Sequence, residues 1–170
     1  PLKFDPHVSW PIIGVTGLAV GGLTLFESDL APKHCRWCDT NSLDGNFRNE
    51  VKWSNKNLAN NLSHVTGFVA SPLFAIGTHF WLDWKNDRVA DYYTDYSIIA
   101  ESTLIATLVG QAVQLSVGRE RPDAHHSNPR TSKSSNNTSF YSGHTTIAFS
   151  LAVSSATIAS MEHDEAAPYI

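Results

Sequence analysis

Apolar residues along this chain gather in four stretches separated by polar segments. Residues 8–26 carry no charged side chain, and they are just long enough for a membrane-spanning helix, which needs about 20 such residues. Residues 62–82, 97–117 and 144–161 are also largely apolar, but each contains polar side chains. The first stretch is therefore a clear transmembrane signal. The other three fit either a membrane bundle or the buried helices of a soluble bundle.

The longest predicted helix covers residues 92–117. Its apolar residues recur at spacings of three and four, which is the period of one helix face. Gly118 follows as a typical helix terminator. Gln111 and Gln114 are polar within this run, so in lipid they would face the bundle interior and need partners there.

The second predicted helix covers residues 62–82, and Pro72 should kink or interrupt it because proline cannot continue the backbone hydrogen bonds. Ser142 and Gly143 mark the start of a last helix that ends near residue 161. The remaining segments are polar: an irregular connection, a short amphipathic helix, a charged connection and a flexible loop are expected at 27–45, 46–61, 83–91 and 123–139.

The segments together predict an all-α fold. We find no convincing alternation of apolar and polar residues, the pattern that marks a strand. A single domain is expected over residues 1–170, since that length is typical of one compact unit. The clustering of apolar residues favours a membrane-embedded helical bundle. A mean hydropathy of −0.19 is low for such a protein and keeps a soluble bundle open.

The charge balance argues against a nucleic-acid-binding protein. Twelve Lys and Arg residues stand against 16 Asp and Glu residues, so the net charge is 12 − 16 = −4, whereas such a protein should present a basic stripe. Basic residues nevertheless gather in one segment that contains Arg119, Arg121, Arg130 and Lys133. The segment is either a solvated loop or a local anion site in an acidic protein.

The two cysteines, Cys35 and Cys38, form a single C-x-x-C pattern. A structural zinc site needs about four ligands, and a thioredoxin-like site needs a βαβ context, so neither is indicated. A small-loop disulfide in an oxidising compartment or two free thiols remain. No metal site is predicted.

The first motif that can carry chemistry is Gly-Arg-Glu-Arg-Pro at residues 118–122. Guanidinium groups bind phosphate oxygens in a bidentate manner and stay charged at any working pH. Pro122 fixes the backbone directly after the pair Arg119 and Arg121. We expect these two arginines to hold a tetrahedral oxyanion at a helix end.

The second motif is Ser-Gly-His-Thr at residues 142–145. Gly143 has no side chain, so its backbone N–H can approach an anion closely. Ser142 offers a hydroxyl at a helix N-terminus, where free N–H groups favour negative charge. His144 can then act as a general acid toward a leaving alkoxide.

In this order, and each beside a predicted helix end, the motifs resemble the first two signatures of the type-2 phosphatidic acid phosphatase and vanadium haloperoxidase superfamily. That family pattern is K-x6-R-P, then P-S-G-H, then S-R-x5-H-x3-D. The resemblance covers roughly residues 62–161. It implies an α-helical bundle that hydrolyses phosphate esters through a phosphohistidine, without a cofactor or metal, and whose phosphate site vanadate can occupy. It also implies that Arg121, Ser142 and Gly143 bind the phosphate and that His144 protonates the leaving group.

The sequence departs from the family pattern at three places. Gln114 stands where the first motif has lysine. It can donate a hydrogen bond but brings no charge, and Arg119 is the candidate to supply that charge instead. Tyr141 replaces the proline of the second motif. The third motif has no counterpart, and His163, which lacks the Ser-Arg lead, is expected to be a solvent-exposed residue in a charged turn. We therefore expect the nucleophile to lie beyond residue 170 and the present chain alone to be inactive.

Three functional interpretations remain open. The first is a membrane phosphatase of lipid phosphates, with both motifs and the cysteines on the outer or periplasmic side. The distribution of Lys and Arg opposes that orientation, since five lie in residues 27–61 and two in 83–93. The second is a soluble secreted or periplasmic acid phosphatase or vanadate-dependent haloperoxidase. The third is a non-catalytic helical membrane or assembly protein. The substrate and the oligomeric state are left open.

Overall fold

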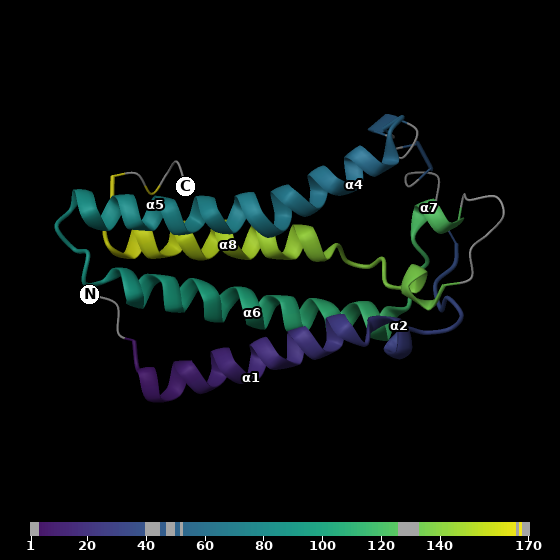
Figure 1. Ribbon diagram of the computed structural model, residues 1–170, viewed down its shortest axis with the longest axis horizontal. Helices are drawn as coiled ribbons and strands as arrows, with labels where there is room; N and C mark the ends of the chain where they lie inside the picture. Colours follow the sequence, from purple (N-terminus) through teal and green to yellow (C-terminus); the bar gives the residue numbers. More distant parts are fainter. Residues whose placement is uncertain are drawn as a thin grey trace.

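The computed structural model describes residues 4–39, 45–46, 50–51, 53–125, 133–165 and 167. Over these residues the chain is an elongated bundle of helices without a β-strand (Figure 1). Among the described residues, one isolated β-bridge joins Trp37 and Arg119, and it is not part of a strand. The all-α prediction is therefore confirmed.

The first long helix, α1, covers Pro6–Leu25 and is followed by the short helix α2, Glu27–Leu30. The carboxylate of Asp5 caps α1 by accepting a hydrogen bond from the His7 N–H at 3.0 Å. No residue of α1 is buried. Leu18, for example, is 80% exposed. The predicted helix at 8–26 is thus confirmed to within two residues at its start and one at its end.

A second long helical segment consists of α4, Lys56–Val65, the π-helical turn η1, Thr66–Ala70, and α5, Ser71–Lys85. The predicted start at residue 62 is wrong. The side chain of Asn55 caps the helix by accepting from the Leu58 N–H at 3.0 Å, so the helix begins at Lys56 and takes in the end of the segment assigned to a separate amphipathic helix.

The π-helical turn explains how the chain passes Pro72 without ending the helix. Proline lacks an N–H, and its ring crowds the carbonyl one turn earlier. A π-turn widens the backbone at that place and releases carbonyls from their usual partners. One such carbonyl, that of Thr66, accepts the Ser71 hydroxyl at 2.8 Å. The irregularity expected at Pro72 is therefore a π-turn just before it.

The last two long helices are α6, Tyr92–Val117, and α8, Gly143–Met161. Gly118 ends α6 in the left-handed conformation, with φ of 62°, which glycine adopts without a steric penalty. Ser142 caps α8 by accepting from the Thr145 N–H at 3.4 Å. Both predicted boundaries are confirmed. His163, in the turn after α8, is exposed as expected.

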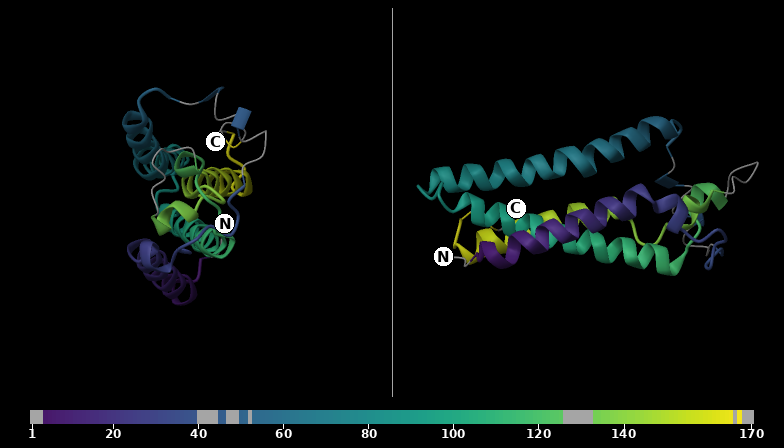
Figure 2. Two further views of the ribbon diagram at one scale, coloured as in Figure 1. Left: turned by 90° about the vertical axis from the view of Figure 1, so that its right-hand side faces the viewer. Right: turned by 60° about the horizontal axis from the view of Figure 1, so that its bottom comes forward.

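The four long helical segments lie side by side. Helix α8 lies between α5 and α6, and α1 packs on the other side of α6 (Figures 1 and 2). The amide of Gln111 on α6 donates to the hydroxyl of Thr24 on α1 at 2.8 Å, which supplies the partner expected for a polar residue in lipid. A small apolar core joins α5, α6 and α8; its buried members are Ala75, Ile99, Leu151 and Ile158.

In the described part of the chain, three helical segments are long and apolar enough to cross a membrane: Pro6–Leu25, Asn57–Lys85 and Tyr92–Val117. Large apolar side chains on their outer faces are exposed, including Phe74 at 67%. Such a surface is typical of an interaction with lipid or another apolar partner. The bundle is compatible with a membrane protein.

The segment predicted as a loop at 123–139 contains helical turns at both ends. These are α7, Pro122–His125, and η2, Ser134–Asn137. Residues 126–132, which include Arg130, lie outside the described residues. The flexibility of this segment stays a prediction.

Candidate active site

Both sequence motifs lie at the same end of the bundle, where α6 ends and α8 begins (Figure 1). Helices α2 and α7 lie at this end too. The segment after α2 is tied to the motif region by hydrogen bonds, among them the Asn137 amide donating to the Pro32 carbonyl at 2.6 Å. The fold thus brings together two motifs and an N-terminal segment that are separated in sequence.

The cysteine segment packs directly on the first motif. Cys35 and Cys38 form a disulfide with their Cα atoms 5.4 Å apart. Within this loop, the Arg36 N–H donates to the Gly118 carbonyl at 2.9 Å, and the Glu120 N–H donates to the Trp37 carbonyl at 3.1 Å. The disulfide loop and the first motif, which have no visible connection in the sequence, thus form one structural unit.

The side chain of Arg119 lies over the indole of Trp37. Its guanidinium carbon is 4.8 Å from the ring centroid, a cation–π geometry. This contact orients the guanidinium along the disulfide loop. A role of Arg119 in phosphate binding stays a prediction, and it would require this arginine to serve both the indole and the anion.

Arg121 is half-exposed and faces acidic and hydroxyl groups. Its Nη2 lies 3.4 Å from the Thr138 hydroxyl and 3.7 Å from a carboxylate oxygen of Glu27. The Thr138 hydroxyl in turn donates to Glu27 at 2.7 Å. An anion at Arg121 would therefore compete with the carboxylate of Glu27.

We predict that Glu27→Gln increases phosphate or vanadate affinity. The substitution removes the charge that faces Arg121, but the pair is long and exposed, and such pairs contribute about 1 kcal/mol or less. The dissociation constant for vanadate, measured by titration calorimetry, should fall by up to about fivefold. Asp29→Asn on the same short helix is the control and should leave it unchanged. Weaker binding by Glu27→Gln would show that the carboxylate supports the site.

The N-terminus of α8 is held in place from α6. The Gln114 side-chain amide donates to the carbonyl of Tyr141, the residue before Ser142. The same nitrogen lies 3.8 Å from where a Cβ on Gly143 would be. Gln114 is therefore beside the predicted phosphate site, where its amide positions the backbone that leads into α8. Direct contact of Gln114 with phosphate stays a prediction.

The ring of His144 packs against the π-turn and the helix before it. Its Nε2 lies 3.3 Å from Nδ1 of His64, and its ring centroid is 4.7 Å from that of Phe68. Gly67 is buried beneath the ring, and a Cβ there would stand only 2.7 Å from the His144 Cδ2. The absence of a side chain at Gly67 thus allows the imidazole of His144 to lie where it does.

The surroundings of His144 act on its protonation. Burial, followed by the charges of His64 and Arg121, lowers the pKa of His144 below its usual value of 6.5. Sequence reasoning missed His64 because no motif marks it and it is 80 residues away from its partner. A π-turn is frequent at functional sites, but the sequence shows it only indirectly, through Pro72.

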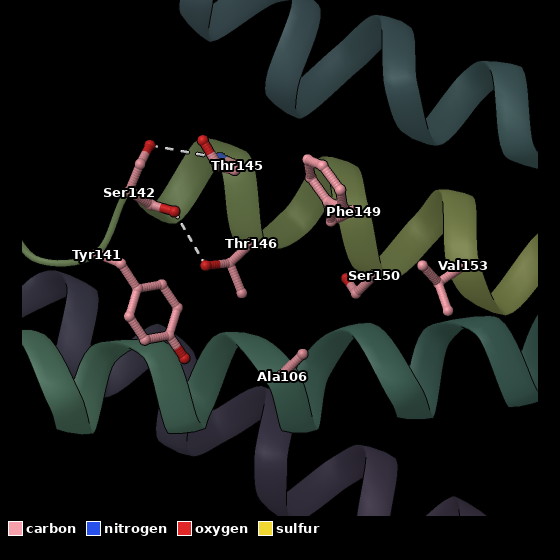
Figure 3. A pocket seen from close by; sticks show the side chains of 8 residues that line it. All are labelled: Ala106, Tyr141, Ser142, Thr145, Thr146, Phe149, Ser150 and Val153. Atoms are coloured by element: carbon pink, nitrogen blue, oxygen red, sulfur yellow. Dashed lines mark hydrogen bonds between the residues drawn. The ribbon is translucent and has the colours of Figure 1, made fainter.

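A groove runs along α8 from the second motif (Figure 3). It has a volume of about 600 Å³. Its walls come from α6, the segment before α8 and α8 itself, with Ser142 near one end and Val153 further along the helix (Figure 3). The lining is largely apolar; it consists of Ala106, Tyr141, Ser142, Thr145, Thr146, Phe149, Ser150 and Val153.

The comparison with protein families bears directly on this end of the bundle. Residues 95–165 match the model of the PAP2 superfamily. The PAP2 match contains nearly all of α6, both motifs and all of α8, so the resemblance to the type-2 phosphatidic acid phosphatase superfamily is confirmed. It supports a relationship to phosphatases at the level of the superfamily. No curated protein and no solved structure gives a significant match.

Proposed function

We propose that the native protein is a membrane phosphatase that hydrolyses the phosphate esters of lipids by the phosphohistidine route of the PAP2 superfamily. The observation that carries the proposal is the groove beginning at Ser142. A polar head at the N-terminus of α8 and an apolar groove that leads away from it fit an amphiphilic substrate.

In the proposed reaction, the phosphate group lies at the N-terminus of α8. The backbone N–H of Gly143, the hydroxyl of Ser142 and the guanidinium of Arg121 would stabilise its charge. A histidine of the kind that the third family motif supplies would attack phosphorus while the bond to the lipid oxygen breaks. His144 would give its proton to that oxygen, so that the lipid leaves as a neutral alcohol. Water then releases inorganic phosphate from the phosphohistidine.

The size of the groove allows a direct test of the lipid substrate. Ala106 lines it from α6, so Ala106→Phe should fill it. The test uses the native-length protein, that is, the protein at the length that its own cell makes. In its Ala106→Phe variant, we expect the KM for phosphatidic acid in detergent micelles to rise about tenfold or more, while hydrolysis of a small soluble phosphomonoester stays unchanged. Ala112→Phe is the matched control, since Ala112 is exposed on the same helix and does not line the groove.

The outcomes separate the parts of the proposal. Equal effects of Ala106→Phe on both substrates would contradict a groove for the lipid chain. Phosphate release from neither substrate by the native-length protein would contradict the phosphatase itself and favour a non-catalytic role.

We further propose that the site faces the outside or the periplasm. The support is the Cys35–Cys38 disulfide at the same end as both motifs, since disulfides persist in oxidising compartments. Lys133 is exposed at this end and Val89 is exposed at the other. In intact cells, a membrane-impermeant maleimide should label Lys133→Cys and leave Val89→Cys unlabelled. The reverse pattern would place the site in the cytoplasm.

A further inference from the structure

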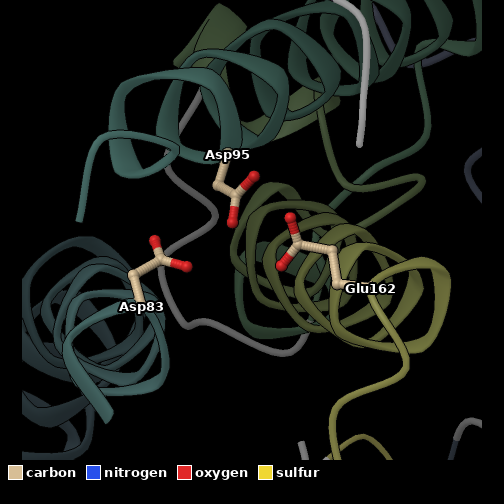
Figure 4. A group of neighbouring side chains, drawn as sticks. All are labelled: Asp83, Asp95 and Glu162. Atoms are coloured by element: carbon tan, nitrogen blue, oxygen red, sulfur yellow. The ribbon is translucent and has the colours of Figure 1, made fainter. Parts of the chain in front are cut away.

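Three carboxylates converge at the end of the bundle opposite to the candidate active site. Asp83 comes from α5, Asp95 from α6, and Glu162 from the residue that follows α8 (Figure 4). Asp83 is 1% exposed and Asp95 is 0% exposed. One oxygen from each of the three groups lies within 4.8 Å of the others. Figure 4 shows the three side chains directed toward a common point between the helices.

Among the residues that the structure describes, the cationic groups around this cluster do not balance its charge. Arg88 contacts Glu162 and Asp164 at 3.0 Å each and Asp83 at 3.7 Å. One arginine thus contacts three carboxylates, and the cluster contains a fourth, Asp95, that Arg88 is not seen to contact. The sum over these five side chains is 1 − 4 = −3 when all carboxylates are ionised. Buried charges need partners, so this arrangement is unfavourable as it stands.

A histidine extends the cluster without resolving its charge. The Nδ1 atom of His79 lies 3.5 Å from an Asp95 oxygen, and its side chain is 2% exposed. A proton on this ring would still leave the six side chains with a sum of −2. Its contact with Asp95 is long for a hydrogen bond, which leaves Asp95 in need of a closer partner.

The unpartnered atoms are independent evidence that a ligand binds at this cluster. Among the described residues, neither carboxylate oxygen of Asp83 nor of Asp95 has a hydrogen-bond partner. The Nε2 atom of His79 has none either. All three side chains are more than nine-tenths buried. Buried polar atoms are almost always paired in native proteins. Five unpaired atoms in one place therefore indicate a bound group.

We propose that Asp83, Asp95 and Glu162 bind a hard divalent cation such as Ca²⁺ or Mg²⁺. Carboxylate oxygens are the ligands that these ions prefer, at about 2.0–2.6 Å. Two ligands on opposite sides of one ion are therefore about 4–5 Å apart, which matches the separation of the three oxygens. The ion would supply the positive charge that Arg88 alone does not.

The place of the site assigns it a structural role. It joins the C-terminal end of α5, the N-terminal end of α6 and the C-terminal end of α8, and the phosphate site lies at the other end of α6 and α8. The cation would hold together the three helices that form the apolar core. This inference does not depend on the proposed phosphatase activity, and it differs from the expectation, made from the sequence, of a protein without a metal.

The test uses the purified full chain in detergent, treated with EDTA and then freed of it. The melting temperature is measured with added CaCl2, MgCl2 or MnCl2, against NaCl of the same ionic strength. We expect one of the divalent ions to raise it saturably, by roughly 5–10 °C at about 100 times the dissociation constant. Titration calorimetry should give one ion per chain.

Variants assign the effect to the cluster. Asp95→Asn should abolish the rise in melting temperature. Glu162→Gln, at the edge of the cluster, should weaken ion binding at least tenfold. This second variant provides the test if Asp95→Asn does not fold. Glu101→Gln on the same helix is the matched control and should keep the full effect, since Glu101 is not part of the cluster.

Two results would overturn the proposal. One is a melting temperature that responds to none of the three chlorides beyond the NaCl reference but rises on acidification, which would mean that protons neutralise the carboxylates. The other is an ion effect that Glu162→Gln and Glu101→Gln both leave intact, which would place the ion elsewhere on the protein.

Discussion

Replacement of His144 by asparagine in the native-length protein is expected to lower kcat for phosphate release by about 10²–10⁴-fold, the usual contribution of a general acid. Asparagine can occupy much of the space of the imidazole, but it has no titratable proton to give to the leaving oxygen. Steady-state hydrolysis of a phosphate ester with a poor leaving group measures the effect. An activated ester, whose leaving group needs no proton, should lose much less.

The matched control for this experiment is His163→Asn, because His163 is exposed in the turn beyond the far end of α8. Asparagine also tolerates the positive φ of 59° at that position. The control should retain full activity. Equal losses in both variants would mean that asparagine acts through the stability of α8 and not through proton transfer at His144.

The pH profile follows from the same residue. A general acid works in its protonated form, and burial, with His64 and Arg121 nearby, lowers the pKa of His144. We therefore expect kcat/KM, which reports the free enzyme, to decline as pH rises through a value below 6.5. His64→Asn should move the decline to higher pH, because it removes a neighbour that opposes protonation of His144.

Gly67→Ala is expected to have the second-largest effect, through position alone. The new Cβ would stand 2.7 Å from the His144 ring, closer than carbon atoms approach in real structures, so the imidazole has to move. A displacement of about 1 Å lowers catalysis by about 10²-fold when it separates a catalytic group from its target. The vanadate dissociation constant should change little, since Arg121 and Ser142 are not touched. We expect kcat to fall and KM to stay nearly constant.

Gly77→Ala provides the control for Gly67→Ala. Gly77 lies on α5 in the same continuous helix, and a Cβ there would meet nothing within 4 Å. Both substitutions add the same methyl group to a helical glycine, so their effects on helix propensity are alike. If Gly77→Ala lowers kcat as much as Gly67→Ala does, the contact with His144 is not the cause.

The parts of the fold that local signals define could be predicted from the sequence. The bounds of α6 were predicted correctly, because a charged connection precedes it and Gly118 follows it. The start of α8 followed from Ser142, whose side chain caps the helix. The start of α4 at Lys56 was missed, since Asn55 stands among several polar residues that could each cap a helix.

Features of the site that depend on distant contacts could not be predicted in this way. The disulfide loop lies on Gly118 and the His64 ring lies on His144, and in each case about 80 residues separate the partners. The acidic cluster likewise depends on contacts between residues of different helices. In sequence, Asp83 and Asp95 look like charged helix ends that face solvent, and only the packing of three helices buries them together.

The exposure of α1 has a consequence for how the protein is made. In the proposed membrane protein, a helix that is apolar all round and has no fully buried residue can enter a bilayer by itself, before the rest of the chain has been synthesised. Its later attachment to α6 then depends on packing and on the Gln111 amide, which donates to the Thr24 hydroxyl at 2.8 Å and to the Val20 carbonyl at 3.5 Å. Insertion and assembly would then be separate steps, and a chain that lacks the Thr24 hydroxyl should reach the membrane normally but hold α1 and α6 together less stably.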